Sequence, residues 1–479
     1  MAKAWPENQF YQGNYAPITI EADAADLIVT GEVPKDLHGA LYRNGPNPQY
    51  APWSQGHHWF LGDGMVHGFF IEDGKISYRN RWVQTEKFKK EREVGEPLLS
   101  TDFGQMGQAD PRGEGVKLNV ANTNILWHGG KLLALEEVNP PVAMNPDTLE
   151  TEGPWTFNGD WAGNVTAHPK IDPKTGGMIF FNYMAGGDRG EGVAINEVDK
   201  DGRIIYSDVI MGPYASMIHD FIVTDQHIVL PIFPATIDFE RVARGGPFIA
   251  WDPSQQTHIG ILERGAPASE VKWFKGPPAY VYHPLNGWDQ LNGSKQIVCD
   301  VMQYDACPLF AEEGKNPDDL DGMESKLVRW TFDLDGNSED FKQEVIDDID
   351  GDFPRFDERY AGLKNGVGYF AIKTNSGNDK GPFDTILGRN MESGGHDKWT
   401  PNQNGRDHVY VMEPIFVPRE KDSAEGDGWL LVPTWDGNAN QSSLAILNAG
   451  DLSSGPIAEA HLPHRVPYGF HGNWREQRW

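Results

Sequence analysis

The chain has 479 residues, enough for two or three ordinary domains or for one large domain built from repeats. Its 70 acidic residues outnumber its 41 basic residues, and the net charge of −29 opposes binding to nucleic acid or to anionic membrane surfaces. No run of about 18 apolar residues occurs, and no apolar segment follows the first lysine, so we expect a soluble, cytoplasmic protein.

Short strands separated by turns are predicted along the whole chain, because 54 glycines and 34 prolines interrupt the apolar runs. The clearest patterns of strand, turn and strand cover residues 69–83, 125–138, 168–184, 198–210, 249–262, 291–302 and 444–462. The best candidate for a short helix lies at residues 85–99, where the run of charges is typical of a solvated face. The chain is therefore predicted to be all-β.

The number of short hairpins favours a β-propeller over a pair of β-sandwiches. No Pro/Ser-rich linker divides the chain, so we expect a single domain over residues 1–479, with residues 1–30 forming an N-terminal extension that packs on it. No repeat of fixed period is visible, so this choice depends on the density of strands and on the positions of the histidines.

The chain has 15 histidines and two cysteines, Cys299 and Cys307, which lack the CxxC spacing of a zinc or redox motif. Four histidines stand far apart in separate apolar contexts: His168, His219, His283 and His471. Such distant residues can bind one metal only if the fold brings their strands to a common axis, as a propeller does. Other histidines lie closer together and resemble a local metal pair: His57, His58 and His67, or His461 and His464. Spacing alone leaves the choice among these sets open.

Several motifs, in order from about residue 30 to the C-terminus, give the chain a resemblance to a known family. They are LYRNGPNPQY (41–50), HHWFLGDGMVHGF (57–69), LETEGPWTF (149–157), TAHPKIDPKTGG (166–177), MIHDFIVT (217–224), MEPIFVPR (412–419) and FHGNW (470–474). Together they resemble the carotenoid cleavage oxygenase family, which includes a lignostilbene and isoeugenol branch. Because the motifs cover nearly the whole chain, the resemblance is specific.

The resemblance implies a seven-bladed β-propeller with a cap of loops and a short helix over a metal on its axis. It implies one Fe(II) per chain, with O₂ as co-substrate, bound by the four separated histidines: His168, His219, His283 and His471. Four neutral imidazoles suit Fe(II), and an octahedral iron bound by them keeps two positions open for O₂ and for substrate or water. We expect the double bond of a conjugated alkene to be split into two carbonyl products.

The resemblance also implies carboxylates that accept the second N–H of three of the ligands. The expected pairs are Glu137 with His219, Glu413 with His471 and Asp352 with His283. Relatives usually carry glutamate at the third position, and aspartate is one methylene shorter. We therefore expect a shifted backbone, a bridging water or a weaker contact at Asp352.

Four further residues are predicted to act on the substrate. Thr123 matches a position whose side chain restricts an open iron site in some relatives. In the lignostilbene branch a lysine and a tyrosine bind and help to ionise a 4-hydroxyl group; here the lysine position is Glu136, and the tyrosine falls at Asp102 or Phe103. A carboxylate in place of a cation would repel a phenolate, so the usual activation of a phenol is not expected, although a neutral phenol can still donate a hydrogen bond to Glu136.

The predicted function is an iron oxygenase that cleaves an aryl alkene or a stilbene-like double bond. An apocarotenoid is the alternative substrate. A non-catalytic propeller that serves as a binding module is the alternative from another class, since propellers have many unrelated functions. The expected partner is a small apolar or aromatic alkene and no nucleic acid, while membrane association stays open.

Overall fold

The computed structural model describes residues 5–53, 56–103, 107–161, 163–291, 293–315, 323–374, 383–402 and 407–476. Over these ranges the chain is mostly β-structure, with two α-helices, α1 (Glu86–Val94) and α2 (Phe239–Ala243). Short 3-10 helices are η1 (Gln9–Tyr11), η2 (Gly13–Tyr15), η3 (Trp59–Leu61), η5 (Pro111–Gly113), η6 (Phe157–Gly159), η7 (Ala268–Glu270) and η9 (Glu358–Tyr360). None of the helices in the described part of the chain is both long and apolar enough to span a membrane.

Helix α1 occupies the segment that the sequence predicts to be helical. It begins after Thr85, whose hydroxyl accepts the N–H of Phe88 and so satisfies one of the free donors of the first turn. It ends at Gly95, where the backbone turns to φ +82, a conformation that glycine adopts without strain. The local capping residues therefore explain both ends of the helix.

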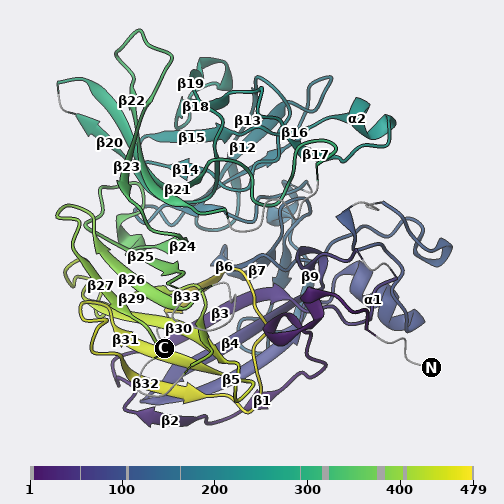
Figure 1. The fold of residues 1–479 in the computed structure, drawn as a ribbon, viewed down its shortest axis with the longest axis vertical. Helices are drawn as coiled ribbons and strands as arrows, with labels where there is room; N and C mark the ends of the chain where they lie inside the picture. The colour runs from purple at the N-terminus through teal and green to yellow at the C-terminus, as the bar shows by residue number, and fades with distance from the viewer. Residues whose placement is uncertain are drawn as a thin grey trace. The chain divides into compact units, whose positions relative to one another are not determined.

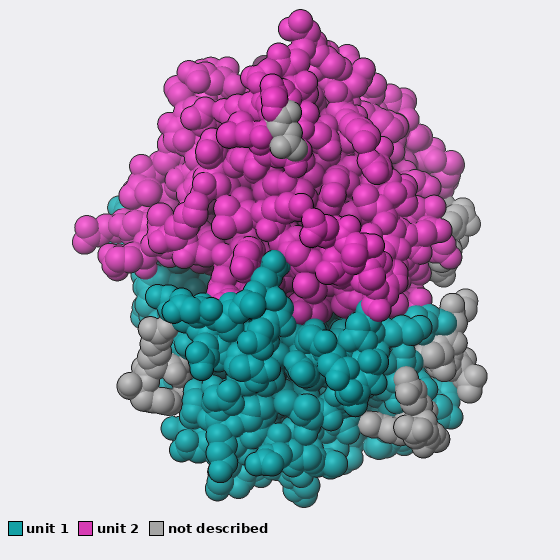
Figure 2. Space-filling model, turned by 90° about the vertical axis from the view of Figure 1, so that its left-hand side faces the viewer, with its two compact units in different colours: residues 1–167, 374–387, 397–479 teal, residues 168–373, 388–396 magenta. Residues whose placement is uncertain are grey.

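The chain divides into two compact units, drawn in teal and magenta in Figure 2. Residues 1–167, 374–387 and 397–479 form the first unit, which contains three antiparallel sheets. One sheet has the order β1 (Asp23–Ala24), β5 (Lys75–Trp82), β4 (Gly64–Glu72), β3 (Gly39–Pro46), β33 (Gly472–Glu476). The next has the order β2 (Ile28–Gly31), β32 (Pro456–His461), β31 (Gln441–Asn448), β30 (Gly428–Asp436), β28 (Val409–Val411), and β29 (Ile415–Pro418) also pairs with β30. The last has the order β6 (Asn124–His128), β7 (Lys131–Leu135), β8 (Val142–Met144), β9 (Thr151–Pro154).

Residues 168–373 and 388–396 form the second unit. Its first sheet has the order β10 (Lys170–Ile171), β11 (Met178–Tyr183), β12 (Gly192–Val198), β13 (Ile204–Met211). Its second has the order β14 (Ile222–Val223), β15 (His227–Ile232), β18 (Thr257–Glu263), β19 (Lys272–Gly276), and β16 (Ala235–Ile237) pairs with β17 (Ile249–Trp251). Its third has the order β20 (Tyr280–Leu291), β21 (Lys295–Tyr304), β22 (Lys326–Asp333), β23 (Lys342–Asp347).

One further sheet has the order β24 (Gly351–Arg355), β25 (Val367–Ile372), β26 (Thr385–Asn390), β27 (His396–Trp399). The sheets with four or more strands are the blades of a seven-bladed β-propeller, so the predicted fold class is confirmed (Figure 1). Within the predicted N-terminal extension, β1 pairs with β5 and β2 with β32. The single domain over residues 1–479 stays a prediction.

Segments from the two ends of the chain share two sheets of the first unit. Ile28 in β2 pairs with His461 in β32, and Arg43 in β3 pairs with Gly472 in β33. Because β33 begins directly after His471, its pairing with β3, which also pairs with β4, fixes the backbone at that histidine.

Large side chains fill the core of the second unit next to two of the predicted ligands. Phe221, two residues after His219, and Tyr280, three residues before His283, are both fully buried and belong to one hydrophobic cluster. Close packing of such rings leaves little freedom to the neighbouring backbone. The core therefore holds both ligand segments in place.

Candidate metal centre

Three histidines of the second unit direct their Nε2 atoms at one another. His168 lies just before β10, His219 just before β14, and His283 within β20. The Nε2 atoms of His168 and His219 are 3.0 Å apart, and those of His219 and His283 are 3.2 Å apart. A neutral imidazole has one donor and one acceptor nitrogen, so three converging Nε2 atoms cannot all be satisfied by one another. The arrangement favours a cation bound among them.

A β-bulge accompanies the position of His283. The register between β20 and β21 shifts between Val281 and Pro284 and again between Pro284 and Asn286. Bulges re-aim side chains and are common beside functional sites. The bulged backbone explains how a residue inside a long strand can turn its ring toward the other histidines.

His471 is held by hydrogen bonds to its ring Nδ1 and to its backbone. Its Nδ1 lies 2.9 Å from Glu413 Oε1, and the N–H of Gly472 donates to Glu413 Oε2 at 2.8 Å. The backbone N–H of His471 donates to the carbonyl of Thr123 at 3.1 Å, and its carbonyl accepts from Asn44 at 3.0 Å. Glu413 is 1% exposed, so it accepts the hydrogen bonds from His471 and Gly472 away from water.

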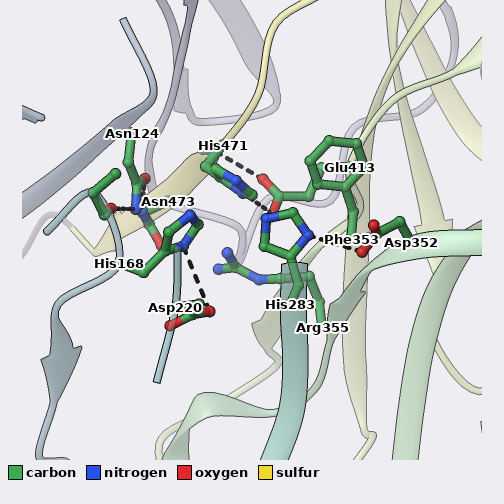
Figure 3. Close-up of polar contacts among 12 residues, drawn as sticks. Asn124, His168, Asp220, His283, Asp352, Phe353, Arg355, Glu413, His471 and Asn473 are labelled. Atoms are coloured by element: carbon green, nitrogen blue, oxygen red, sulfur yellow. Dashed lines mark hydrogen bonds and ion pairs between the residues drawn. The ribbon is translucent and has the colours of Figure 1, made fainter. Parts of the chain in front are cut away.

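The four separated histidines form one group of candidate ligands. One ring nitrogen from each of His168, His219, His283 and His471 lies within 4.8 Å of those from the other three. Figure 3 shows His168, His283 and His471 with the carboxylates beside them. A group of ligands made of imidazoles, with no thiolate or carboxylate among them, suits a borderline metal such as iron. The residues therefore fit the metal that the resemblance implies.

Asp352 reaches His283 directly despite its shorter side chain. Its Oδ1 lies 2.8 Å from His283 Nδ1, and its Oδ2 accepts the hydroxyl of Tyr304 at 3.0 Å. The register of β24 with β25 shifts between Asp352 and Arg355, and Phe353 has φ +51, which is unusual for a non-glycine residue. Burial opposes ionisation of Asp352, but His283 and the hydrogen bonds outweigh it and hold its pKa below the usual value. Of the three expected alternatives, the irregular backbone is the one that the structure has, and the contact is direct.

The histidines that lie closer together in sequence have other partners. His57 bonds Thr101, His67 bonds Tyr78, His461 bonds Ser443, and His464 bonds the carbonyl of Arg465. Burial lowers the pKa of His57 to about 4 and that of His58 to about 3, so both rings are neutral near pH 7. These rings belong to side-chain packing, and the group of candidate ligands contains none of them.

Glu136 and Thr123 have separate hydrogen-bond partners, and those of Thr123 include His471. The buried carboxylate of Glu136 accepts the N–H of Val120 at 3.1 Å and the side-chain amide of Asn139. Burial raises the pKa of Glu136 to about 7. The N–H of Thr123 donates to the carbonyl of Leu135 at 2.9 Å, and the Thr123 carbonyl accepts the N–H of His471.

The other predicted residues are Glu137, Asp102 and Phe103. Glu137 is half-buried directly after Glu136, and its pairing with His219 stays a prediction. Asp102 forms an isolated bridge with His57, and the Phe103 ring packs 4.9 Å from that of His58. Asp102 and Phe103 therefore lie beside the segment of His57 and His58.

Aromatic residues that the sequence analysis did not single out link this segment to the ligand His471. The ring of Phe470 lies 4.5 Å from that of Trp59 and 5.0 Å from that of Phe60. Phe470 directly precedes His471, so an aromatic surface adjoins a candidate ligand. In the sequence these aromatic residues stand directly beside histidines, in the motifs HHWF and FHGNW, and that position was the signal that could have identified them.

Two buried charges were also missed. Arg43 is 2% exposed. Burial lowers the pKa of Arg43 to about 10, and the charge of Glu413 partly offsets this lowering. Asp220 is 5% exposed and faces His168. Arg43 lies in the motif LYRNGPNPQY and Asp220 in the motif MIHDFIVT. The position of a charged residue in a motif does not reveal which group its side chain faces in the fold.

Comparisons with known proteins agree along nearly the whole chain. Residues 15–476 match the family model described as retinal pigment epithelial membrane protein, RPE65. Isoeugenol monooxygenase from Pseudomonas nitroreducens is 34% identical over 96% of this chain and 97% of its own length. Lignostilbene-alpha,beta-dioxygenase isozyme III from Sphingomonas paucimobilis is 35% identical over 98% of both chains.

Solved structures give the same picture. The crystal structure of lignostilbene dioxygenase from Pseudomonas brassicacearum matches with a TM-score of 0.91 and 33% identity, covering 99% of this chain and all of that chain. Apocarotenoid oxygenase from Synechocystis, in a Glu150Gln variant, matches with a TM-score of 0.84 and 26% identity over 97% of this chain and 98% of that chain.

Proposed function

Because the chain belongs to the carotenoid cleavage oxygenase family represented by RPE65, we propose that it uses Fe(II) and O₂ to cleave the C=C bond of an aryl alkene or stilbene-like substrate into two carbonyl products. The observation that carries the proposal is the group of four histidine nitrogens within 4.8 Å. Similarity to isoeugenol monooxygenase and lignostilbene dioxygenase over more than nine tenths of the chain supports the substrate class.

One iron per chain would be held by His168, His219, His283 and His471, and when bound it would supply the activation of O₂ for addition to the alkene. The protein residues around it orient these ligands. Asp352 and Glu413 accept the Nδ1 proton of His283 and His471, which leaves each Nε2 lone pair free for the metal. Neither acid needs to exchange a proton with the substrate.

The substrate side of the proposal follows from Glu136. Its buried carboxyl group accepts hydrogen bonds from the N–H of Val120 and from the side-chain amide of Asn139. Above about pH 7, where Glu136 is ionised, it carries the same charge as a phenolate and repels it. We therefore propose that a free 4-hydroxyl is not required, and that the aromatic surface of Trp59, Phe60 and Phe470 contacts the substrate.

A substrate panel tests this proposal. Iron-loaded protein is incubated aerobically with resveratrol, its 4-methoxy analogue, isoeugenol, 4-vinylguaiacol and an apocarotenal, and the carbonyl products are quantified. We expect cleavage of the aryl alkenes, with kcat/KM for the hydroxy and methoxy stilbenes within about threefold, because less than 1 kcal/mol should separate them. Turnover of the apocarotenal alone would contradict the aryl-alkene assignment.

The panel also separates the alternatives. Carotenoid cleavage oxygenase 1 from Neurospora crassa is 34% identical over 98% of this chain, which makes an apocarotenoid the second candidate. A binding module would retain no iron and cleave nothing in the panel. We propose that the protein is cytoplasmic and that it has no nucleic-acid partner, and the net charge of −29 supports the second point because it disfavours binding to polyanions.

A further inference from the structure

An ion pair with a buried carboxylate joins the two segments that carry His168 and His219. Lys170 Nζ lies 2.6 Å from Asp220 Oδ1. Lys170 is two residues after His168, and Asp220 directly follows His219. The side chain of Asp220 is 4% exposed and that of Lys170 is 29% exposed, so the carboxylate is buried and the ammonium lies near the surface. The pair therefore fixes the two ligand segments to each other.

The second oxygen of Asp220 faces the ring of His168. Asp220 Oδ2 lies 3.7 Å from His168 Nδ1, and Figure 3 shows this contact as a dashed line. Oδ1 is occupied, because it accepts both the Lys170 ammonium and the N–H of Phe221 at 2.6 Å. These two donors hold the carboxylate so that Oδ2 is directed at the imidazole.

This contact involves the same ring nitrogen as those of the two other acids, at a longer distance. Glu413 and Asp352 each place an oxygen at the Nδ1 of their histidine, at 2.9 Å and 2.8 Å. At 3.7 Å the Asp220 oxygen is beyond hydrogen-bond length but still interacts with the ring electrostatically. A metal on Nε2 makes the Nδ1–H more positive and strengthens its attraction to a carboxylate.

We propose that Asp220 is the positioning carboxylate of His168 and that Lys170 holds Asp220 in that position. The inference rests on the proposed function only in taking Fe(II) as the metal. It adds a fourth acid to the three that the resemblance supplies, so that a histidine without an assigned acid acquires one. Lys170 also neutralises the buried carboxylate of Asp220, which without Lys170 would be a buried charge with no ion-pair partner.

Iron affinity, measured without any substrate, tests the proposal. Wild type, Asp220→Asn, Lys170→Met and Lys170→Arg are prepared without metal under anaerobic conditions, and the dissociation constant for Fe(II) is measured by competition with a chelator. We expect about a tenfold weaker affinity in Asp220→Asn, a smaller loss in Lys170→Met, and recovery in Lys170→Arg, because arginine can still pair with the carboxylate. The electron paramagnetic resonance spectrum of the iron–nitric oxide adduct should change in Asp220→Asn.

The chain offers a matched control in the same two segments. Lys174 pairs with Asp225, and both side chains are exposed, at 54% and 37%. Lys174→Met should therefore leave both the iron affinity and the spectrum unchanged. Equal affinity and spectrum in wild type and Asp220→Asn would overturn the proposal.

Two outcomes keep this inference separate from the proposed function. Wild type that binds iron tightly but cleaves no alkene in the panel would remove the proposed function and leave the role of Asp220 standing. Should Asp220→Asn fail to fold, the comparison of Lys170→Met with Lys170→Arg decides, and equal iron affinity in those two variants would count against the proposal.

Discussion

Replacing Glu413 by alanine should weaken iron binding by about 10- to 100-fold and lower the stability of the protein by about 3 to 5 kcal/mol. The loss of iron affinity follows because His471 Nδ1 loses the oxygen 2.9 Å away that fixes its tautomer and ring orientation. The loss of stability has two causes. The N–H of Gly472 loses its buried acceptor, and Arg43 loses the negative charge that offsets its burial.

Two measurements check the Glu413 prediction. The iron dissociation constant measures the effect on the ligand His471, and thermal unfolding of the metal-free proteins measures the loss of stability. For a chain of this length a change of 1 kcal/mol in stability shifts the melting temperature by about 1 °C. Glu413→Gln is the control, because its amide oxygen still accepts one of the two hydrogen bonds and its loss should be smaller. Iron affinity and melting temperature equal to wild type in Glu413→Ala would show that His471 does not depend on this acid.

Glu136→Gln should make the protein more stable than wild type above pH 7 and no more stable at pH 4.5. Burial raises the pKa of Glu136 from 4.5 to about 7, so the folded protein binds this proton more tightly than the unfolded chain does. The stability that the protonated carboxyl contributes is complete below about pH 4.5 and is lost as the pH rises through 7. The shift of the Glu136 pKa corresponds to a loss of about 3 kcal/mol of stability above pH 7, and glutamine, which does not ionise, avoids this loss.

Melting temperatures of wild type and Glu136→Gln at several pH values between 4.5 and 8 measure this effect. The difference between the two proteins should grow in favour of the variant by about 3 °C across that range, using the same conversion. Because each comparison is made at one pH, the titration of all other groups cancels. A difference that does not change with pH would mean that Glu136 is ionised throughout, stabilised by the N–H of Val120 and the amide of Asn139.

The strands were predictable because their signals are local. Glycine and proline mark the turns, and α1 carries its own capping residues, Thr85 and Gly95. The pairing of strands was not predictable from such signals. Gly39 in β3 pairs with Glu476 in β33, and nothing in either segment encodes a partner at the other end of the chain. The propeller was predicted from strand density and from the resemblance.

The ligand histidines show the same division. Each stands in a short apolar context, which many buried histidines share, and His57 with His58 looked as good on spacing. The resemblance selected the four, and the structure brings their ring nitrogens together. The resemblance did not supply two features of the structure: the φ of +51° at Phe353 beside Asp352, and the orientation of Asp220 toward His168.

The substrate residues were the hardest to place. Asp102 and Phe103 came from counting residues back from Glu136, and loops of different length shift such a count. Phe103 packs on His58, whereas Glu136 is bonded to Val120 and Asn139. Sequence alone could not reveal that Glu136 is occupied by its own neighbours, because that depends on how the loop before Thr123 folds back.

Iron content after purification under anaerobic, iron-supplied conditions tests the central claim most directly. We expect close to one iron per chain in wild type and a loss of most of it in His219→Ala, because His219 Nε2 lies between those of His168 and His283. His258→Ala, a histidine outside the group, should retain the iron. Absence of iron from wild type, or equal iron in wild type and His219→Ala, would contradict a four-histidine iron centre.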